Sequence, residues 1–88
     1  MGDEPIADTQ PVLERVSANL RDARQDAGLT QEQLAEGSEV DRVEVEQIER
    51  GVALPDIETV ARLAGALGVP PAELCAGIEW DPERQRFE

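Results

Sequence analysis

The side chains able to do chemistry in this chain are mostly charged: 20 Asp and Glu, eight Arg, one Cys and no His. So many carboxylates could hold a metal ion or act as general acid and base. The order of residues, however, matches neither a calcium-binding loop, nor a Gly-rich phosphate loop, nor a strand-turn-helix nucleophile motif. Cys75 has no His to activate it, so it is interpreted as a small buried residue on a helix. We therefore expect no enzymatic activity, no metal site and no cofactor.

The net charge of −12 constrains the choice of partner. All eight cations are Arg, and there is no Lys. DNA-binding proteins usually present a basic face, because contacts with phosphates supply most of their affinity. The acidity therefore has two interpretations: it keeps the surface soluble, or the partner is not a nucleic acid.

A chain of 88 residues suits one small domain with a modest core. With no Tyr, one Trp and one Phe, that core must be aliphatic. No apolar run approaches the roughly 20 residues of a membrane span. The start of the chain, residues 1–4 (MGDE), is acidic where a signal peptide is basic. Cys75 alone cannot form an internal disulfide, which suits a cytoplasmic protein.

Two short helices joined by a turn are predicted over residues 29–51. Leu34 and Ala35 fit the buried side of the first helix, and Val45 and Ile48, three residues apart, fit that of the second. Between them lies the short segment 37–40 (GSEV), whose Val40 provides one apolar contact. This arrangement is typical of a helix-turn-helix.

At these residues the chain resembles the Cro/repressor-type (XRE-like) helix-turn-helix domain of bacterial and phage transcription regulators. The resemblance covers roughly Leu13 to Leu74 and rests on residues 27–35 (AGLTQEQLA), 48–51 (IERG), Pro55 and 63–70 (LAGALGVP). It implies an all-α domain of five helices. It also implies a sequence-specific DNA-binding transcription regulator that acts as a homodimer on a palindromic operator.

Turn and cap residues predict where the elements begin and end. We expect a disordered acidic tail over residues 1–9, a helix-turn-helix domain over 10–77 and an extension over 78–88. The expected helices are 10–27, 31–36, 41–50, 56–67 and 70–75, started by Thr30, Asp41 and Asp56 and ended by Gly residues. Thr30 with Gln33, and Asp41 with Glu44, have the spacing of capping boxes. The end of the second helix is open, because either Gly37 ends it or Glu39 adopts a left-handed conformation. On the fourth helix, the residues expected to face the core are Ile57, Val60, Ala61, Leu63, Ala64 and Leu67.

The extension is predicted to be a small β-hairpin around residues 81–84 (DPER), because Pro in second place favours a type I turn. Pairing Trp80 with Gln85 places Glu79 opposite Arg86, and then Ile78 opposite Phe87. The alternative is an irregular tail with Trp80 folded onto the first helix.

The resemblance assigns DNA contacts to four positions. Gln31, at the start of the second helix, matches a phosphate-contacting residue. Arg42 and Gln47 match base-reading positions, where Arg can bind guanine and Gln can bind adenine. Val43 lies beside them on the same helix. For each, the alternative is an ordinary solvated helix residue.

Arg24 and Glu49 match a partly buried ion pair that in this family joins the first helix to the third. Its role is structural. Breaking it should be more costly than breaking a surface pair, because the remaining charge stays desolvated.

The surface departs from the family where DNA would bind. Residues 30–54 contain seven acids and two Arg, and Asp41, Glu44 and Glu46 stand where small polar or basic residues are usual. Each carboxylate near a phosphate repels it. The exposed aliphatic and aromatic residues instead suggest a protein contact: Val43, Val52, Leu54, Trp80 and Phe87. Leu54 could alternatively belong to the core.

Three functions therefore stay open. The first is a DNA-binding transcription regulator, the second an acidic helix-turn-helix scaffold that binds a basic protein, and the third a DNA mimic. We expect a homodimer in which the fifth helix and the hairpin form the interface, and no membrane partner.

Overall fold

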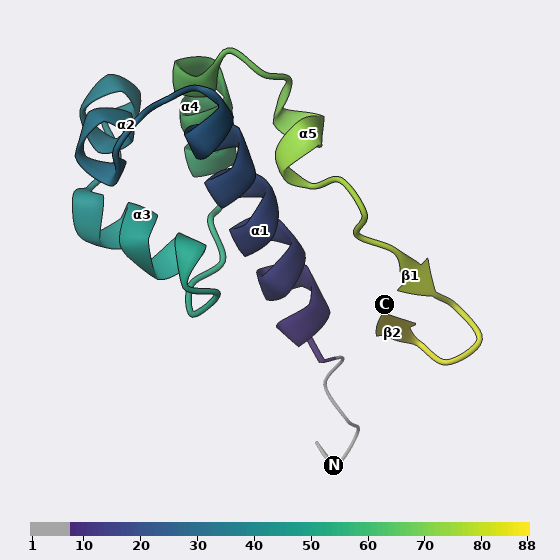
Figure 1. Cartoon of the computed structure of the whole chain (residues 1–88). Coiled ribbons are helices and arrows are strands. Elements are labelled where there is room, and N and C mark those ends of the chain that lie inside the picture. Colours follow the sequence, from purple (N-terminus) through teal and green to yellow (C-terminus); the bar gives the residue numbers. More distant parts are fainter. Residues whose placement is uncertain (1–7) are drawn as a thin grey trace.

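The structure is a computed structural model, and it describes residues 8–88. These residues form five helices and a small two-stranded sheet (Figure 1). The elements are α1 (Gln10–Asp26), α2 (Gln31–Ser38), α3 (Arg42–Glu49), α4 (Ile57–Leu67), α5 (Pro71–Leu74), β1 (Trp80–Asp81) and β2 (Arg86–Phe87). The all-α fold with a C-terminal hairpin is thus confirmed. Most of the tail expected over 1–9 lies outside the described residues.

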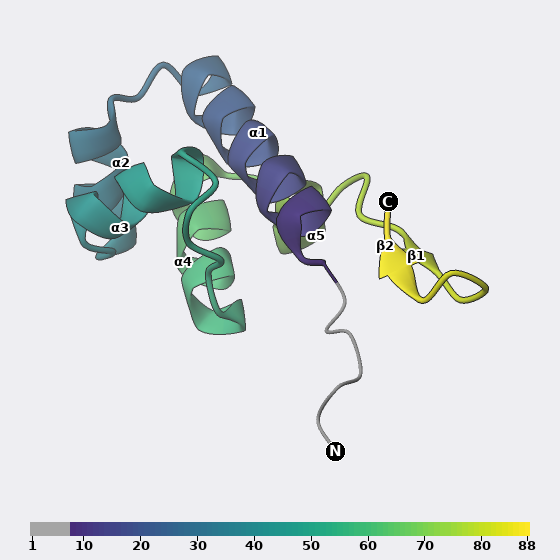
Figure 2. The same ribbon diagram turned by 90° about the horizontal axis from the view of Figure 1, so that it is seen from below.

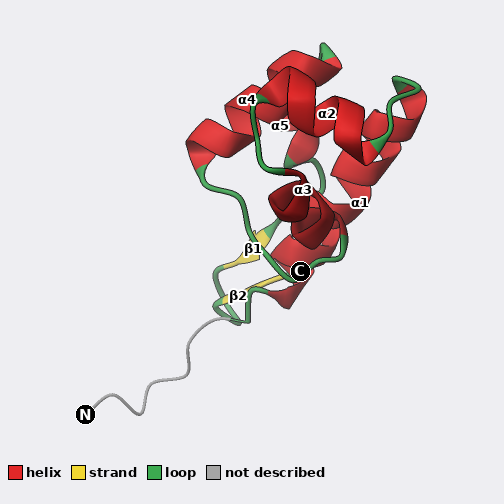
Figure 3. Ribbon diagram, turned by 90° about the vertical axis from the view of Figure 1, so that its left-hand side faces the viewer, coloured by secondary structure: helices red, strands yellow, loops and turns green. Residues whose placement is uncertain are grey.

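The helices enclose one core. The long helix α1 packs against α3 and α5, α2 packs against α3 and α4, and α4 packs against α5. The pair α2 and α3 lies at one side of the molecule, while the hairpin extends from the opposite side (Figures 1 and 2). In Figure 3 the side that carries α2 and α3 faces the viewer. None of the helices within residues 8–88 has the length and apolarity that crossing a membrane requires.

The core is aliphatic, as expected. Leu20, Leu34, Val45, Ile48 and Leu63 are fully or almost fully buried, and so is Leu74 of α5. Around them lie smaller or less central residues: Val16, Ala35, Val40, Val60 and Ala64.

Three expectations about burial were wrong. Ile57 is 81% exposed because it lies in the first turn of α4, ahead of the buried stripe that begins at Val60. Ala61 is exposed because it lies one position past Val60, on the outer side of the same helix. Cys75 follows α5 as its C-cap and is exposed, not buried on a helix.

Side chains cap three of the described helices, α2, α3 and α4, at their starts. Thr30 and Gln33 form the predicted capping box of α2, and the Asp56 carboxylate accepts the Thr59 backbone N–H at the start of α4. Asp41 caps α3 as predicted. Its carboxylate accepts the N–H of Val43, two residues on, rather than that of Glu44, which the capping-box spacing implied.

The turn between α2 and α3 uses a left-handed Glu. Helix α2 continues through Gly37 to Ser38, and Glu39 follows as its C-cap at φ 58°. Of the two open alternatives, the structure therefore has the left-handed Glu39. The end predicted at 36 was two residues early, because Gly37 keeps a helical conformation.

The predicted hairpin is present, but its register was wrong by two residues. Trp80 pairs with Phe87, and Asp81 pairs with Arg86. The Asp81 carboxylate accepts the backbone N–H groups of Glu83 and of Arg84. Because Asp81 pairs with Arg86, the loop between the strands consists of residues 82–85, with Gln85 left-handed at φ 53°. The rings of Trp80 and Phe87 meet edge to face, with centroids 5.0 Å apart, so the alternative of an irregular tail is wrong.

Candidate nucleic-acid interface

The exposed side of α3 carries both Arg residues of the helix-turn-helix. Val45, Ile48 and Glu49 face inward and are buried. Val43, Gln47 and Arg50 are exposed and recur at intervals of four and three, so they share the outward face, with Arg42 beside Val43. The sequence interpretation did not include Arg50, although its spacing of three from Gln47 would have indicated this face. Arg42 and Arg50 thus lie at the two ends of a strip that carries the uncharged Val43 and Gln47 and also, four residues from each Arg, the carboxylate of Glu46.

Both Arg residues have only loose acidic neighbours. Arg42 Nη1 lies 4.0 Å from Glu32 Oε2, and Arg50 Nη1 lies 3.5 Å from Glu46 Oε1. Such exposed pairs contribute about 0–1 kcal/mol. Either guanidinium can therefore exchange its carboxylate for a phosphate or a base at small cost.

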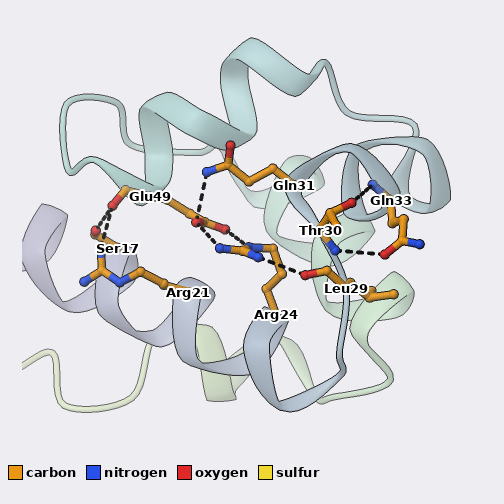
Figure 4. Close-up of polar contacts among 8 residues, drawn as sticks. All are labelled: Ser17, Arg21, Arg24, Leu29, Thr30, Gln31, Gln33 and Glu49. Carbon is orange, nitrogen blue, oxygen red and sulfur yellow. Dashed lines mark hydrogen bonds and ion pairs between the residues drawn. The ribbon is translucent and has the colours of Figure 1, made fainter.

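An ion pair between Arg24 and Glu49 joins α1 to α3 (Figure 4). Arg24 Nε donates to Glu49 Oε2 at 2.6 Å, and Arg24 Nη2 donates to Glu49 Oε1 at 3.0 Å. The Glu49 side chain is only 4% exposed. Hydrogen bonding to this carboxylate raises the pKa of Arg24, with burial acting in the opposite direction. The pair is therefore joined by two hydrogen bonds in an environment that largely excludes water.

The backbone of Glu49 is also held by α1. Its carbonyl oxygen accepts a hydrogen bond from Ser17 Oγ and another, at 3.1 Å, from Arg21 Nη1. A carbonyl in the last turn of a helix has no partner within the helix, so these donors satisfy it. Sequence reasoning missed both residues, because 32 and 28 positions separate them from Glu49.

The structure places Gln31 at the first position of α2, half-buried beside Glu49. Its side-chain Nε2 donates to Glu49 Oε1 at 3.1 Å (Figure 4). Thr30 and Gln33 lie next to it and bond to each other, closing the start of the helix. Gln31, the predicted phosphate contact, is thus hydrogen-bonded to the carboxylate that forms the ion pair between α1 and α3.

The candidate protein-contact residues fall into two separate groups. Val43, Val52 and Leu54 are exposed on α3 and on the loop that follows it, so Leu54 is not a core residue. Trp80 is 47% exposed and Phe87 is half-buried on the hairpin. The loop and the hairpin lie at opposite sides of the molecule (Figures 1 and 2), so the structure does not bring the two groups together.

The acids of the helix-turn-helix are spread over α2, the turn and α3. Glu36, Glu39 and Asp41 are exposed around the turn, whereas Glu44 and Glu46 are half-buried at the edges of α3. Within residues 8–88, no three acidic or Cys side chains come together as a metal site would require. The acids therefore act here as charge on a surface.

Two short helices joined by a tight turn, α2 and α3, within a bundle of helices are the arrangement of helix-turn-helix proteins. The chain belongs to the helix-turn-helix family, whose family model (HTH_3) matches residues 20–74. It is similar to the transcriptional repressor RstR of the cryptic phage CTXphi in Vibrio cholerae, with 40% identity over 63 residues. That match covers 72% of this chain and 57% of the repressor, so the chain spans little more than half of the repressor's length.

Two solved structures are similar throughout the helical part. The restriction-modification controller protein C.AhdI from Aeromonas hydrophila is 39% identical, with a TM-score of 0.68 over 70% of this chain and 94% of that protein. The clp gene regulator ClgR from C. glutamicum is 34% identical, with a TM-score of 0.67 over 81% of this chain and 86% of that protein.

Proposed function

We propose that this chain is a sequence-specific DNA-binding transcription regulator. The observation that carries the proposal is the outward face of α3, where Arg42 and Arg50 flank Val43 and Gln47 and are held only by the loose pairs with Glu32 and Glu46. Its relatives, a phage repressor and bacterial regulators, support the same role.

The exposed face of α3 would enter the major groove of DNA. Its eight residues span about 12 Å, which corresponds to about three or four base pairs at 3.4 Å each. Arg42 would donate two hydrogen bonds to a guanine, and Gln47 would bond to an adenine. Gln31 and the N–H groups at the start of α2 would contact a backbone phosphate.

Two copies acting together would read two half-sites of a palindrome. A single short helix contacts too few bases to select one site in a genome, and dimers of helix-turn-helix proteins solve this by binding half-sites about one DNA turn apart. We propose a homodimer that uses α5 and the hairpin. The Trp80 and Phe87 rings lie there, on strands that would be marginal by themselves.

One specific observation favours a second function: residues 30–54 contain seven acidic residues but only two Arg. Such a surface would attract a basic protein and repel a phosphate backbone. In this alternative, Val43, Val52 and Leu54 would form the apolar part of the contact. A chain that mimics DNA would present the same acids to a DNA-binding protein.

A mobility-shift titration against mixed genomic fragments at low salt tests DNA binding. R42A should weaken binding and lose about 1–3 kcal/mol of discrimination at one base pair. R62A is the matched control, because Arg62 lies on α4 and pairs with Glu58. Absence of a shift at tens of micromolar protein, where even nonspecific binders are detected, would contradict the proposal.

A further inference from the structure

Glu49 is the point at which α1, α2 and α3 are joined. Its backbone carbonyl accepts from Ser17 and Arg21 of α1, and its carboxylate accepts from Arg24 of α1 and Gln31 of α2 (Figure 4). The same oxygen, Oε1, accepts from Arg24 Nη2 at 3.0 Å and from Gln31 Nε2 at 3.1 Å. The orientation of the Gln31 amide is therefore set by a carboxylate that α1 holds in place.

This arrangement limits what the Gln31 side chain can do. The terminal torsion of Gln has a broad energy profile, so an exposed Gln amide samples many orientations. Here one of the two N–H bonds of Nε2 points to Glu49, which directs the second N–H and the carbonyl oxygen away from the ion pair. The amide is thus oriented before any ligand arrives.

We infer that Glu49 is a positioning residue for the phosphate contact of Gln31. The inference rests on the proposed DNA binding. Glu49 is buried and does not touch the ligand; it acts through the Gln31 amide. A side chain held in its bound orientation loses less conformational freedom when the ligand binds, and so gives a tighter contact. Arg24 holds this carboxylate in place with two hydrogen bonds, so the series of contacts that orients Gln31 begins on α1.

A double-mutant cycle separates positioning from support of the fold. Q31A should weaken DNA binding about tenfold, the factor expected when one hydrogen bond to a charged phosphate is lost. E49Q should also weaken it, because a side-chain amide keeps only one acceptor oxygen for the donors of Arg24 and Gln31, so Gln31 loses its fixed partner. The variant Q31A/E49Q should bind no worse than Q31A alone, because both changes remove the same contact.

S17A provides the matched control. It removes another hydrogen bond to Glu49, the one to the backbone carbonyl, without touching the Gln31 amide. S17A and E49Q are compared with the parent by thermal unfolding, and DNA binding is measured where all variants are folded. S17A should leave the effect of Q31A on binding unchanged. If E49Q weakens binding equally with and without the Q31A change, Glu49 acts only through the fold and the inference is wrong.

A second readout needs no DNA. The side-chain NH₂ resonances of Gln31, assigned by their loss in Q31A, should shift in E49Q and stay in place in S17A. If the parent binds no DNA, the proposed function is wrong. The NH₂ resonances of Gln31 then still test, independently of DNA, whether Glu49 orients the Gln31 amide. Resonances unchanged by E49Q would contradict the inference.

Discussion

At the scale of single residues, Glu39 shows how this chain accepts local strain in the turn of the helix-turn-helix. Its φ of 58° lies in the region that L residues other than Gly seldom occupy. The Glu39 N–H still bonds to the Ala35 carbonyl, and Val40 follows as a buried residue. The geometry of the turn is thus imposed by the packing of Val40 and the two helices rather than by Glu39 itself.

E39G should therefore stabilise the fold by about 0.5–1 kcal/mol, because Gly adopts this conformation without steric cost. E39A is the control, since it removes the same negative charge but keeps the strain. Chemical denaturation measures both variants. If E39A stabilises as much as E39G, the gain comes from charge, and the backbone explanation is wrong.

Asp56 links stability to pH. Its carboxylate accepts the Thr59 N–H at the start of α4, and this bond lowers the pKa of Asp56 below its ordinary value of 3.8. A lowered folded-state pKa means that the contribution is present above the unfolded-state pKa and is lost as the pH falls through the folded-state pKa.

The parent should consequently be more stable than D56N at neutral pH, and the difference should shrink below about pH 4. Asn still caps a helix but carries no titrating charge. Thermal unfolding of both proteins between pH 7 and pH 2 measures this difference, in which the other carboxylates cancel. A gap that is constant over this range would contradict the assignment.

At the scale of elements, two glycines of α4 differ only in backbone conformation. A Cβ at Gly65 or at Gly68 would meet nothing within 4 Å. Gly65 lies inside the helix, whereas Gly68 ends it at φ 73°. The same substitution should therefore have opposite effects at the two sites.

G65A should stabilise the chain by about 0.5–1 kcal/mol, since Gly is a poor helix former. G68A should destabilise it by about 1 kcal/mol or more, because Ala is strained in the left-handed region. The unfolding temperatures of the two variants, compared with that of the parent, test both expectations. Changes of equal sign would show that our boundary for α4 is wrong.

The elements also show how far the sequence alone could be interpreted. The caps of α2 and α4 and the end of α4 were predictable because their chemistry is local: Thr30 and Gln33, Asp56, and Gly68 each act within a few residues. The register of the hairpin was not predictable, because the Asp81 backbone pairs with Arg86 while its side chain accepts the N–H groups of Glu83 and Arg84 inside the loop. The exposure of Ile57 depends on where neighbouring helices end, which periodicity does not contain.

The candidate site could be predicted from the sequence only in part, for a similar reason. The pairing of Arg24 with Glu49 was inferred from a family resemblance, not from spacing. The bond from Gln31 to Glu49 joins residues 18 positions apart. Such a contact depends on how three helices pack, and no local pattern indicates it.

At the scale of the whole molecule, the hairpin is the element with least support from the rest of the chain. Ile78 packs against the core, but beyond it the strands extend away from the helices (Figure 1). Two strands of two residues are marginal in water, so a second copy is the proposed support for the Trp80 and Phe87 rings.

Deleting residues 78–88 should therefore convert the proposed homodimer into a monomer with an intact helical fold. Light scattering gives the mass, and circular dichroism checks the helices. W80S is a milder variant that leaves the chain length unchanged and should weaken the dimer in the same direction. An unchanged mass for both proteins would exclude the hairpin as the interface.

The charge of the molecule gives the central test, because DNA and a basic protein respond to it in opposite ways. Glu44 and Glu46 lie at the edges of α3, and Glu46 also engages Arg50. If α3 binds DNA, replacing these carboxylates relieves repulsion and releases Arg50 for a phosphate. If α3 binds a basic protein, the same change removes attraction.

The decisive measurement is a DNA titration of E44Q/E46Q beside the parent, at several salt concentrations. D22N/E58Q removes the same charge from exposed positions of α1 and α4, away from α3 and from the proposed dimer interface, and serves as the control. Binding by E44Q/E46Q should tighten about fivefold for each carboxylate that lies about 4 Å from a phosphate. The parent should show a shallow dependence on salt, because few cations contact phosphates. Weaker or unchanged DNA binding by E44Q/E46Q, relative to this control, would contradict the account of α3 as the DNA-reading helix.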